Sequence, residues 1–591
     1  MRQRLAQIKQ FKPGAYPRFW AAFIFFFATV VTTWPVLIEP NQWLLFSERR
    51  FDGYGTAWFA DHVWQFVTGE RAFFFSAEIN HPTGLDLRLA DSFLFGFLAL
   101  PISAFASPVA TFNLFSIFAI AATAYAGFKL AIDGIQAGWI ASIACGFIVG
   151  FNSAVMSYRI EGEAYLLASF FLPLLALEGI RLVREPTPMA GVRGALYIGA
   201  LAWSSGYLAV NAFLVTSVLG GLLLVTQRRM DWHALRTPAL VFVGGAILLV
   251  GPVLMLISAG GADSVVEARF PSGEVALKNI AQDSVSLSGL LIPYSASAPL
   301  RQDRIFSLGM VPILFGLSAI MMVGWRRTIP WLGLTAVGVI FAMGPTLKLT
   351  DGDAGILLLP YGWLVALVPN VVAYRMPLRF LTIAFLGLGV LAALFIDALN
   401  KEGISRSWLF GLLTAVIIEA LVFTGALTDP AFTPVEVPVG YSQVSKEGAV
   451  LDLRGHDRYV LRDASLSTFY QLFHGQPVLA DHTQAIDRQD VLARALGLAL
   501  VERETASIRA ILGLLHSLNV TDIAFHPRSF QDTDALQMRT SLVAHCPAVN
   551  PLAEPGDDPV EIFRVPDSSK QIPLEDALQT VDGWIEEWRD G

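Results

Sequence analysis

"PALVFVGGAILLVGPVLMLISAGGA", residues 238 to 262, contains no charged side chain. A helix rises about 1.5 Å per residue, so roughly 20 such residues cross a hydrocarbon core about 30 Å thick. Comparable runs occur at 19 to 38, 109 to 128, 134 to 156, 164 to 180, 207 to 226, 305 to 325, 328 to 347, 380 to 396 and 407 to 427, with a shorter one at 194 to 206. The sequence therefore predicts an α-helical polytopic membrane protein with about eleven spans.

The overall composition supports the same class. Of 591 residues, 54% are hydrophobic and only 15% are charged, which is too apolar for a soluble globular protein. The net charge of -8 provides no basic surface of the kind that binds nucleic acid. We expect a lipid bilayer as the environment and no nucleic-acid partner.

Basic residues between the apolar runs predict the orientation. The N-terminal cluster, Lys129, Arg228 with Arg229, and Lys401 all become cytoplasmic if the N-terminus is inside and the first span is not cleaved. The runs 93 to 106 and 354 to 374 are short or interrupted by proline, so we expect re-entrant or interfacial pieces. This orientation predicts that the C-terminal region lies outside the cytoplasm.

The composition changes after residue 427. "AVLDLRG", "VTDIAFHP" and "VEIFRV" have the pattern of strands, and "LEDALQTVDGWIEEWRDG" that of an acidic terminal helix. We therefore predict two domains: a transmembrane domain over 1–427, which includes a first external loop over 39–108, and a soluble α/β domain over 428–591.

The first external loop carries the most unusual polar residues. "FDGYG" places Asp52 in a glycine-flanked turn just after the first span, where it is either a turn former or a working carboxylate. "TAWFADHVWQFVT" (56 to 68) has the pattern of an interfacial amphipathic helix, with Trp58 at the headgroup boundary and His62 on the wet face. "INHPTGLDLRLADS" adds His81 in a rigid turn and Asp91, whose alternative role is to cap the following segment.

Other charged clusters fall in predicted external loops. "SYRIEGE" (157 to 163) concentrates Arg159, Glu161 and Glu163, as either a binding site or a salt-bridged hairpin loop. "YRMPLRF" offers Arg375 and Arg379 on nearly one helical face if Pro377 opens the helix. These arginines suit phosphate through their planar fork, although they are also suited to anchor the chain at the membrane surface.

The order of these motifs resembles that of the GT-C fold membrane glycosyltransferases. The resemblance rests on the acidic residues of the first loop and on "SYRIEGEAYLLASFFLPLLAL" (157 to 177), "WSSGYLAV" (203 to 210), "MGPTLKLTDGD" (343 to 353), "YRMPLRFL" (374 to 381), "FHGQPVLADHTQ" (473 to 484) and "LHSLNVTDIAFHP" (515 to 527). It covers most of the chain. More narrowly, the chain resembles a bacterial branch of polytopic proteins of this superfamily, which implies a location in the bacterial cytoplasmic (inner) membrane with a periplasmic or extracellular C-terminal domain. The W-W-D-Y-G motif of oligosaccharyltransferases is absent, so transfer to asparagine is not indicated.

The resemblance implies transfer of a hexose or pentose from a polyprenyl-phosphate-linked donor to an envelope acceptor, with inversion at the anomeric carbon. In this function Asp52 is the general base and Asp91 orients the acceptor, or the two hold Mg²⁺ or Mn²⁺. The donor phosphate is expected to bind Arg159, Arg375 and Arg379, and the substrates Glu161, Glu163, Tyr207 and His81.

The acceptor remains open between a glycan, a lipid and a protein. Two alternative functions remain: a transporter or flippase of lipid-linked saccharides, and a non-catalytic envelope assembly partner of the same fold. Transporters commonly contain inverted repeats and charges at mid-membrane, whereas the polar residues of this chain gather at one predicted membrane face.

Overall fold

The structure of the chain is a computed structural model. It describes residues 15–47, 52–88, 90–227, 231–259, 280–281, 283–291, 307–350, 355–367, 376–424, 427, 431–454, 460–480, 487–549, 560–567 and 572–590. Its contacts divide the chain into two compact units. The membrane unit comprises Met1–Ile38, Asp91–Phe95 and Asn113–Ala431; the C-terminal unit comprises Glu39–Ala90, Gly96–Phe112 and Phe432–Gly591. Most of the first loop is thus grouped with the C-terminal residues, whereas the sequence prediction grouped it with the membrane domain.

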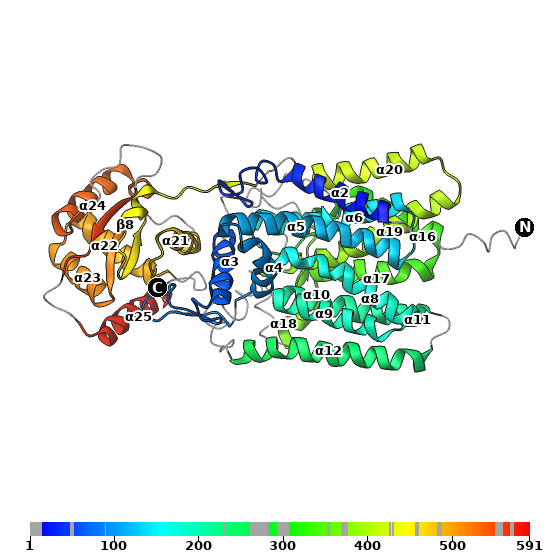
Figure 1. Cartoon of the computed structure of the whole chain (residues 1–591), viewed down its shortest axis with the longest axis horizontal. Helices are drawn as coiled ribbons and strands as arrows, with labels where there is room; N and C mark the ends of the chain where they lie inside the picture. The colour runs from blue at the N-terminus through cyan, green and yellow to red at the C-terminus, as the bar shows by residue number, and fades with distance from the viewer. Residues whose placement is uncertain are drawn as a thin grey trace, which may run out of the picture. The chain divides into compact units, whose positions relative to one another are not determined.

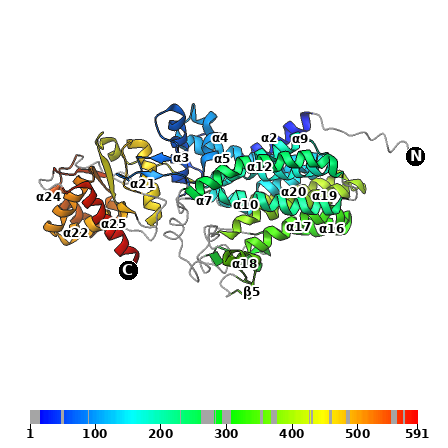
Figure 2. The ribbon, with the colours of Figure 1, turned by 90° about the horizontal axis from the view of Figure 1, so that it is seen from below.

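The membrane unit is built from helices that lie side by side (Figures 1 and 2). They are α2 (Ala15–Thr32), most of α5 (Pro108–Lys129), α6 (Trp139–Gly150), α7 (Ser153–Glu161), α8 (Phe171–Arg184), α9 (Pro188–Ser204), α10 (Gly206–Leu214), α11 (Gly220–Thr226), α12 (Trp232–Ala259), α15 (Leu287–Leu291), α16 (Met310–Val323), α17 (Trp325–Ala342), α18 (Pro360–Leu367), α19 (Leu381–Lys401) and α20 (Arg406–Ile418). Shorter elements are η1 (Leu130–Gly134), η2 (Leu166–Phe170), η3 (Val215–Leu219), η5 (Pro377–Phe380), η6 (Glu419–Phe423), β4 (Thr346–Leu347) and β5 (Leu357–Leu358).

Every apolar run identified in the sequence contains a helix. Within the described part of the chain, five helices are long and apolar enough to cross a membrane, or six if the bent pair α6 and α7 is one span. The interrupted runs form the short helices α4 (Phe93–Ser103) and α18. The chain is therefore a helical membrane protein, and the total of about eleven spans stays a prediction.

Helix α19 lies at the centre of the membrane unit because small residues let its neighbours approach closely. A Cβ on Gly338 of α17 would lie 2.5 Å from the backbone nitrogen of Ala384, and a Cβ on Gly389 would lie 2.8 Å from the Val149 side chain of α6. Without a hydrophobic force between helices in lipid, such close packing supplies much of the association energy. Nearly all of α19 from Leu381 to Asp397 is buried as a result.

The C-terminal unit combines a mixed sheet with helices. Its elements are β1 (Trp43–Leu44), α3 (Asp52–Thr68), β2 (Phe75–Ser76), β3 (Leu85–Asp86), most of α4, β6 (Thr433–Pro434), η7 (Val439–Gln443), β7 (Ala449–Leu453), α21 (Val460–His474), α22 (Arg488–Glu502), α23 (Thr505–Ser517), β8 (Val520–Phe525), η8 (Pro527–Ser529), α24 (Asp532–His545), β9 (Glu561–Arg564) and α25 (Leu574–Asp590). The strands and terminal helix expected from the sequence are all present, with β7 parallel and β9 antiparallel to the central β8.

The first loop pairs with strands far away in sequence. Strand β1 forms an antiparallel ladder with β6, and β2 and β3 form a hairpin within the loop. The hydroxyl of Thr433 also donates a hydrogen bond of 2.8 Å to the carbonyl of Phe46. These bonds explain why residues 39–90 belong to the C-terminal unit.

Candidate functional site

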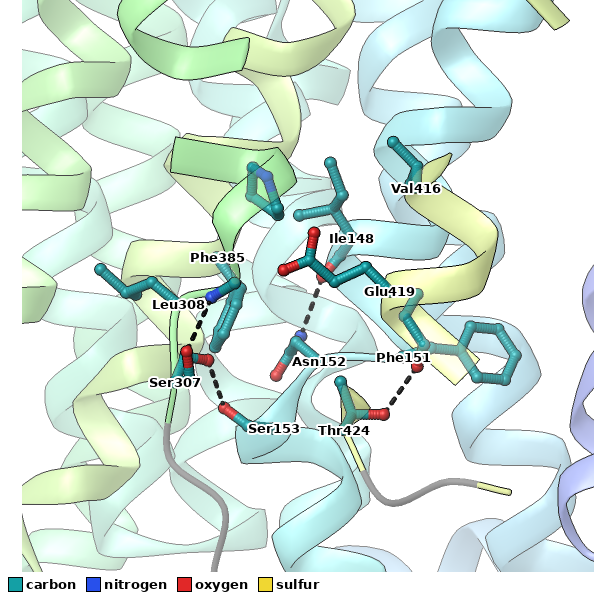
Figure 3. A pocket seen from close by; sticks show the side chains of 13 residues that line it. Ile148, Phe151, Asn152, Ser153, Ser307, Leu308, Phe385, Val416, Glu419 and Thr424 are labelled. Carbon is teal, nitrogen blue, oxygen red and sulfur yellow. Dashed lines mark hydrogen bonds between the residues drawn. The ribbon is translucent and has the colours of Figure 1, made fainter. Parts of the chain in front are cut away.

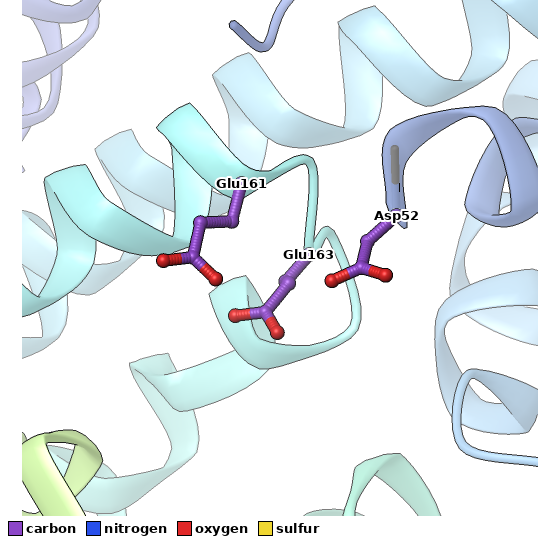
Figure 4. A group of neighbouring side chains, drawn as sticks. All are labelled: Asp52, Glu161 and Glu163. Carbon is purple, nitrogen blue, oxygen red and sulfur yellow. The ribbon is translucent and has the colours of Figure 1, made fainter. Parts of the chain in front are cut away.

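The turn after α7 places two carboxylates beside each other. Asn152 begins α7 by accepting hydrogen bonds from the backbone nitrogens of Ala154 and Val155, both at 3.0 Å. Gly162 ends the helix in the left-handed conformation with φ of 77°. Glu161 and Glu163 flank this glycine, and Figure 4 shows their side chains.

The "SYRIEGE" segment is therefore not a solvent-exposed hairpin loop. Residues 157 to 161 belong to α7. The Arg159 and Glu163 side chains are each only 1% exposed, and Glu161 is 4% exposed. Burying charges without partners costs several kcal/mol per group, so this segment needs a network of polar partners.

Arg379 supplies the main partner. Its guanidinium forms a buried ion pair with the Glu163 carboxylate, which also accepts a hydrogen bond of 3.3 Å from the Tyr165 hydroxyl. The Glu161 carboxylate adds electrostatic attraction to the same guanidinium. Pro377 is the first residue of η5, the short 3₁₀ helix that contains Arg379 and precedes α19.

Aromatic side chains orient this arginine. The Arg379 guanidinium carbon lies 4.2 Å from the centre of the Tyr207 ring, a cation–π arrangement. The Tyr207 hydroxyl accepts a hydrogen bond of 3.3 Å from the backbone nitrogen of Met376. On the backbone side, the Tyr158 hydroxyl donates to the Arg379 carbonyl at 3.2 Å and lies 2.8 Å from the Thr382 hydroxyl.

Ser205, between α9 and α10, links Asp91 to Tyr207. Ser205 caps α10 by accepting a hydrogen bond from the Tyr207 nitrogen, and its hydroxyl donates to Asp91 at 3.2 Å. The neighbouring Ser204 hydroxyl donates to the Tyr165 carbonyl, and the Ser204 carbonyl accepts from the Ser92 nitrogen. We call these residues the Arg379 network: Asp91, Glu163, Tyr165, Ser204, Ser205, Tyr207 and Arg379.

Arg159 lies in the same turn region on α7. One of its terminal nitrogens donates a hydrogen bond of 2.8 Å to the carbonyl of Thr32, the last residue of α2. Five of the residues predicted to bind substrates or phosphate thus lie in or directly beside one buried polar region: Arg159, Glu161, Glu163, Tyr207 and Arg379. Such a concentration of ionisable groups within a membrane unit is typical of a functional site.

The remaining predicted residues belong to the C-terminal unit or fall outside the described part of the chain. Asp52 is the exposed first residue of α3, in the C-terminal unit. His81 contacts the carbonyl of Leu518 at 3.0 Å within the same unit, and burial lowers its pKa. Arg375 lies outside the described residues.

The prediction that α3 is an interfacial helix with a wet face was wrong. Trp58 and His62 are both completely buried, and apart from Asp52 the exposed residues of α3 lie in its last turn, with Val67. The His62 ring stacks on Trp58 with 5.1 Å between ring centres. The local pattern could not reveal this burial, because the covering residues come from the distant helix α21.

Sequence reasoning also missed several members of the Arg379 network. Ser204 and Ser205 were noted only within the motif "WSSGYLAV", although a serine just before a glycine that starts an apolar run is an N-cap signal. Tyr165 carries no such local signal, because its carbonyl is bonded by Ser204, 39 residues further along the chain.

A second polar feature of the membrane unit is a cavity around Glu419 (Figure 3). The π-helical segment η6 carries Glu419, whose carboxylate accepts hydrogen bonds from the backbone nitrogens of Met310 and Val311 and so caps α16. Asn152 and Ser153 lie on another wall, where the Ser153 hydroxyl donates to the Ser307 carbonyl at 3.1 Å. Carboxylates favour helix N-termini, so we assign Glu419 a structural role.

Comparison with known proteins gives structural matches only. No protein-family model and no curated protein sequence matches the chain. The arabinofuranosyltransferase AftD from Mycobacteria is similar over 94% of this chain and 40% of its own, with 14% identity and a TM-score of 0.54. The chain therefore spans less than half of AftD.

Two other structures match over more of their own length. ArnT from Cupriavidus metallidurans, solved with undecaprenyl phosphate, has a TM-score of 0.48 and 11% identity over 94% of this chain and 98% of its own. The oligosaccharyltransferase of Archaeoglobus fulgidus has a TM-score of 0.49 and 11% identity over 88% and 70%. At these identities a likeness concerns the fold alone. The chain has the GT-C fold of membrane glycosyltransferases.

Proposed function

We propose that this protein transfers a sugar from a polyprenyl-phosphate-linked donor to an envelope acceptor at the outer face of the cytoplasmic membrane. The observation that carries the proposal is the Arg379 network, a buried set of charged and aromatic side chains assembled from four separate segments of the membrane unit. The GT-C fold supports the same class of reaction, because AftD is itself a glycosyltransferase.

Arg379 is proposed to bind the donor phosphate. Tyr207 and Glu163 hold its guanidinium in one orientation, and a planar guanidinium donates two parallel hydrogen bonds to a phosphate. Because one ring face of Tyr207 is already covered by Arg379, we assign Tyr207 to orienting the arginine rather than to stacking on a sugar.

The charge balance implies a further cation. Within the described residues, the network and its flanking residues contain two guanidinium groups and three carboxylates (Arg159 and Arg379; Asp91, Glu161 and Glu163). An added phosphodiester brings one more negative charge. We therefore propose that Arg375 or a divalent cation such as Mg²⁺ or Mn²⁺ completes the donor site, since carboxylate oxygens suit these hard ions.

The proposed reaction needs one general base. An acceptor hydroxyl attacks the anomeric carbon, its proton passes to a carboxylate, and the carbon–oxygen bond to the lipid phosphate breaks on the opposite side, which inverts the configuration. We propose Asp52 as this base and Asp91, held by Ser205, as a residue that orients the acceptor. His81 is left out, because its ring already bonds to Leu518.

The test is sugar transfer in proteoliposomes to a cell-envelope extract supplied as the acceptor, with a panel of radiolabelled undecaprenyl-phosphate-linked hexoses and pentoses as donors. We expect the wild type to release undecaprenyl phosphate, and Arg379→Lys to lower kcat/KM by about 30-fold through loss of charge-assisted hydrogen bonds. Arg181→Lys is the matched control, because Arg181 also pairs with a buried glutamate, Glu178, outside the network. EDTA should abolish transfer if a metal completes the site.

If the wild type releases undecaprenyl phosphate and Arg379→Lys does so with the same kcat/KM, the proposed phosphate site is contradicted. Absence of release with every donor of the panel, in protein that remains folded, would contradict the proposed activity.

A further inference from the structure

Helix α3 is held against helix α21 of the C-terminal region. The ring centres of Tyr54 and Phe469 lie 5.1 Å apart, and the indole nitrogen of Trp58 donates a hydrogen bond of 2.9 Å to the Gln471 side-chain oxygen. Trp58 is completely buried and Gln471 is 1% exposed, so this bond lies in a dry interior. Removing one partner there leaves a buried polar group unsatisfied.

Gln471 makes a second bond with its other amide atom. Its nitrogen donates a hydrogen bond of 2.9 Å to the carboxylate of Glu78, in the loop after α3. Indole only donates and carboxylate only accepts, so the residue between them must both accept and donate, which the Gln471 amide does. Gln471 therefore joins α3 and the loop to α21 at one point.

Arg71 closes the arrangement into a ring of contacts. Its guanidinium pairs with Glu78, lies 3.6 Å from the Asp61 carboxylate of α3, and sits 6.0 Å from the centre of the Trp58 ring. We call this set the clamp: Trp58, Asp61, Arg71, Glu78 and Gln471. Two of its members lie on α3, two in the loop and one on α21, so α3 cannot tilt or slide without breaking several contacts.

The loop side of the clamp is fixed by backbone pairing. The carbonyl of Glu78 accepts from the Val478 nitrogen at 2.8 Å, the His81 nitrogen donates to the Val478 carbonyl at 3.0 Å, and the Asn80 nitrogen donates to the Ala480 carbonyl at 3.0 Å. Val478 in turn bridges to Val450 of β7. The loop is thus bonded to the segment that bridges to β7, which gives Glu78 a fixed position.

Asp52 is the first residue of the clamped helix. It lies six positions before Trp58, a distance of about 9 Å along a helix axis. A tilt of α3 at Trp58 therefore moves the Asp52 carboxylate. We propose that Gln471 is a positioning residue, through which the C-terminal region sets the position of the Asp52 carboxylate for catalysis; this inference rests on the proposed function.

The test combines turnover with hydrogen exchange on the full-length protein in nanodiscs. Gln471→Leu keeps the side-chain size and removes both bonds. We expect amide exchange in the first turns of α3 to rise about tenfold or more, since the bonds that restrain the helix are lost. The donor in the turnover assay is the undecaprenyl-phosphate sugar that the wild type consumes. We expect kcat to fall about 10- to 100-fold at unchanged donor KM, because misplacement of a catalytic group by about 1 Å can have an effect of this size.

Gln489→Leu is the matched control. Gln489 is equally buried in the same unit and donates to the Ser467 hydroxyl at 2.8 Å, with no bond to α3. A comparable loss of thermal stability is expected, with α3 exchange and kcat unchanged. The double variant Gln471→Glu with Glu78→Gln swaps the amide and the carboxylate, so that the bond from Trp58 and the bond between residues 471 and 78 each keep one donor and one acceptor. We expect kcat of this double variant to lie within a few-fold of the wild-type value, and kcat of each single variant to stay low.

A double-mutant cycle separates positioning from general damage. If Gln471 acts through Asp52, Gln471→Leu should have little further effect on kcat in an Asp52→Asn background. Unchanged α3 exchange in Gln471→Leu, or an equal loss of kcat in both backgrounds, overturns the proposal. If Asp52→Asn transfers sugar as fast as the wild type, the proposed base fails instead, and the exchange experiment still decides whether the clamp holds α3.

Discussion

Arg379 and Glu163, 216 residues apart in the chain, form a buried ion pair in the membrane unit. The pair joins η5, which precedes α19, to the turn after α7, and Tyr207 from α10 lies on the guanidinium face. Three separate segments therefore meet at one charged contact, so both stability and the proposed chemistry depend on it.

Breaking this pair on one side should cost more than removing it altogether. A buried charge left without its partner typically costs about 3 to 5 kcal/mol, whereas an apolar replacement of both partners is often nearly neutral. We expect Arg379→Met to lower the free energy of unfolding by that amount and Arg379→Met with Glu163→Leu to recover much of it. Unfolding in mixed micelles, followed by circular dichroism, measures both; equal destabilisation of the two variants would contradict the expectation.

The Tyr207 ring should matter more than its hydroxyl. Tyr207→Phe keeps the face against Arg379 and removes the hydroxyl that accepts from the Met376 nitrogen. Tyr207→Leu also removes a cation–π interaction worth about 0.5 to 2 kcal/mol, which corresponds to a rise of roughly 2- to 30-fold in donor KM. Donor titrations of the two variants check this, and equal donor KM values for both would show that the ring face has no role.

Glu419 should act as a structural cap. Glu419→Gln keeps one acceptor oxygen but replaces the other with a donor that faces a backbone N–H of α16, so we expect a loss of about 1 to 3 kcal/mol of stability. Gly309→Ala should destabilise as well, because Gly309 has φ of 81° and a Cβ there would lie 2.6 Å from a Glu419 oxygen. Unchanged unfolding of both variants would exclude the cap.

The C-terminal unit should lose stability in mild acid. Burial lowers the pKa of His62 to about 4, below the value of about 6.5 expected in the unfolded chain, so the unfolded state binds more protons between these values. The contribution of neutral His62 is fully present above pH 6.5 and falls by about 3 kcal/mol as the pH approaches 4.

His62→Gln isolates this effect. The variant is expected to be less stable at pH 7.5 but to show a flatter dependence of Tm on pH between 6.5 and 4. The buried carboxyls of Asp61 and Glu78, whose pKa values burial raises, contribute to both proteins and cancel in the comparison. Identical pH slopes would mean that His62 does not titrate in this range.

The helices were predictable because lipid imposes a simple rule on sequence. A charge-free run long enough to cross the bilayer must satisfy its backbone internally, and so each run forms a helix. Residues in "SYRIEGE" and "YRMPLRF" were also identifiable, since charged groups beside spans are rare and costly. Their pairing was not predictable, because nothing local indicates that Glu163 meets Arg379.

The environment of α3 in the first loop could not be predicted from the sequence. The spacing of Phe59 and Val63 indicated an apolar face, and the lipid surface was the nearest apolar partner that local sequence could suggest. The actual partner is α21, more than 400 residues further along the chain, where Gln471 accepts from Trp58. A single polar residue on a distant helix leaves no periodic signal in the sequence of the loop.

The central claim is that the Arg379 network binds the phosphate of a polyprenyl donor. A cryo-EM structure of the protein in nanodiscs with undecaprenyl phosphate tests it most directly. The account predicts phosphate density about 3 Å from the Arg379 guanidinium, with Tyr207 still on the guanidinium face. Phosphate density elsewhere in the membrane unit, with the pair of Arg379 and Glu163 unchanged, would contradict it.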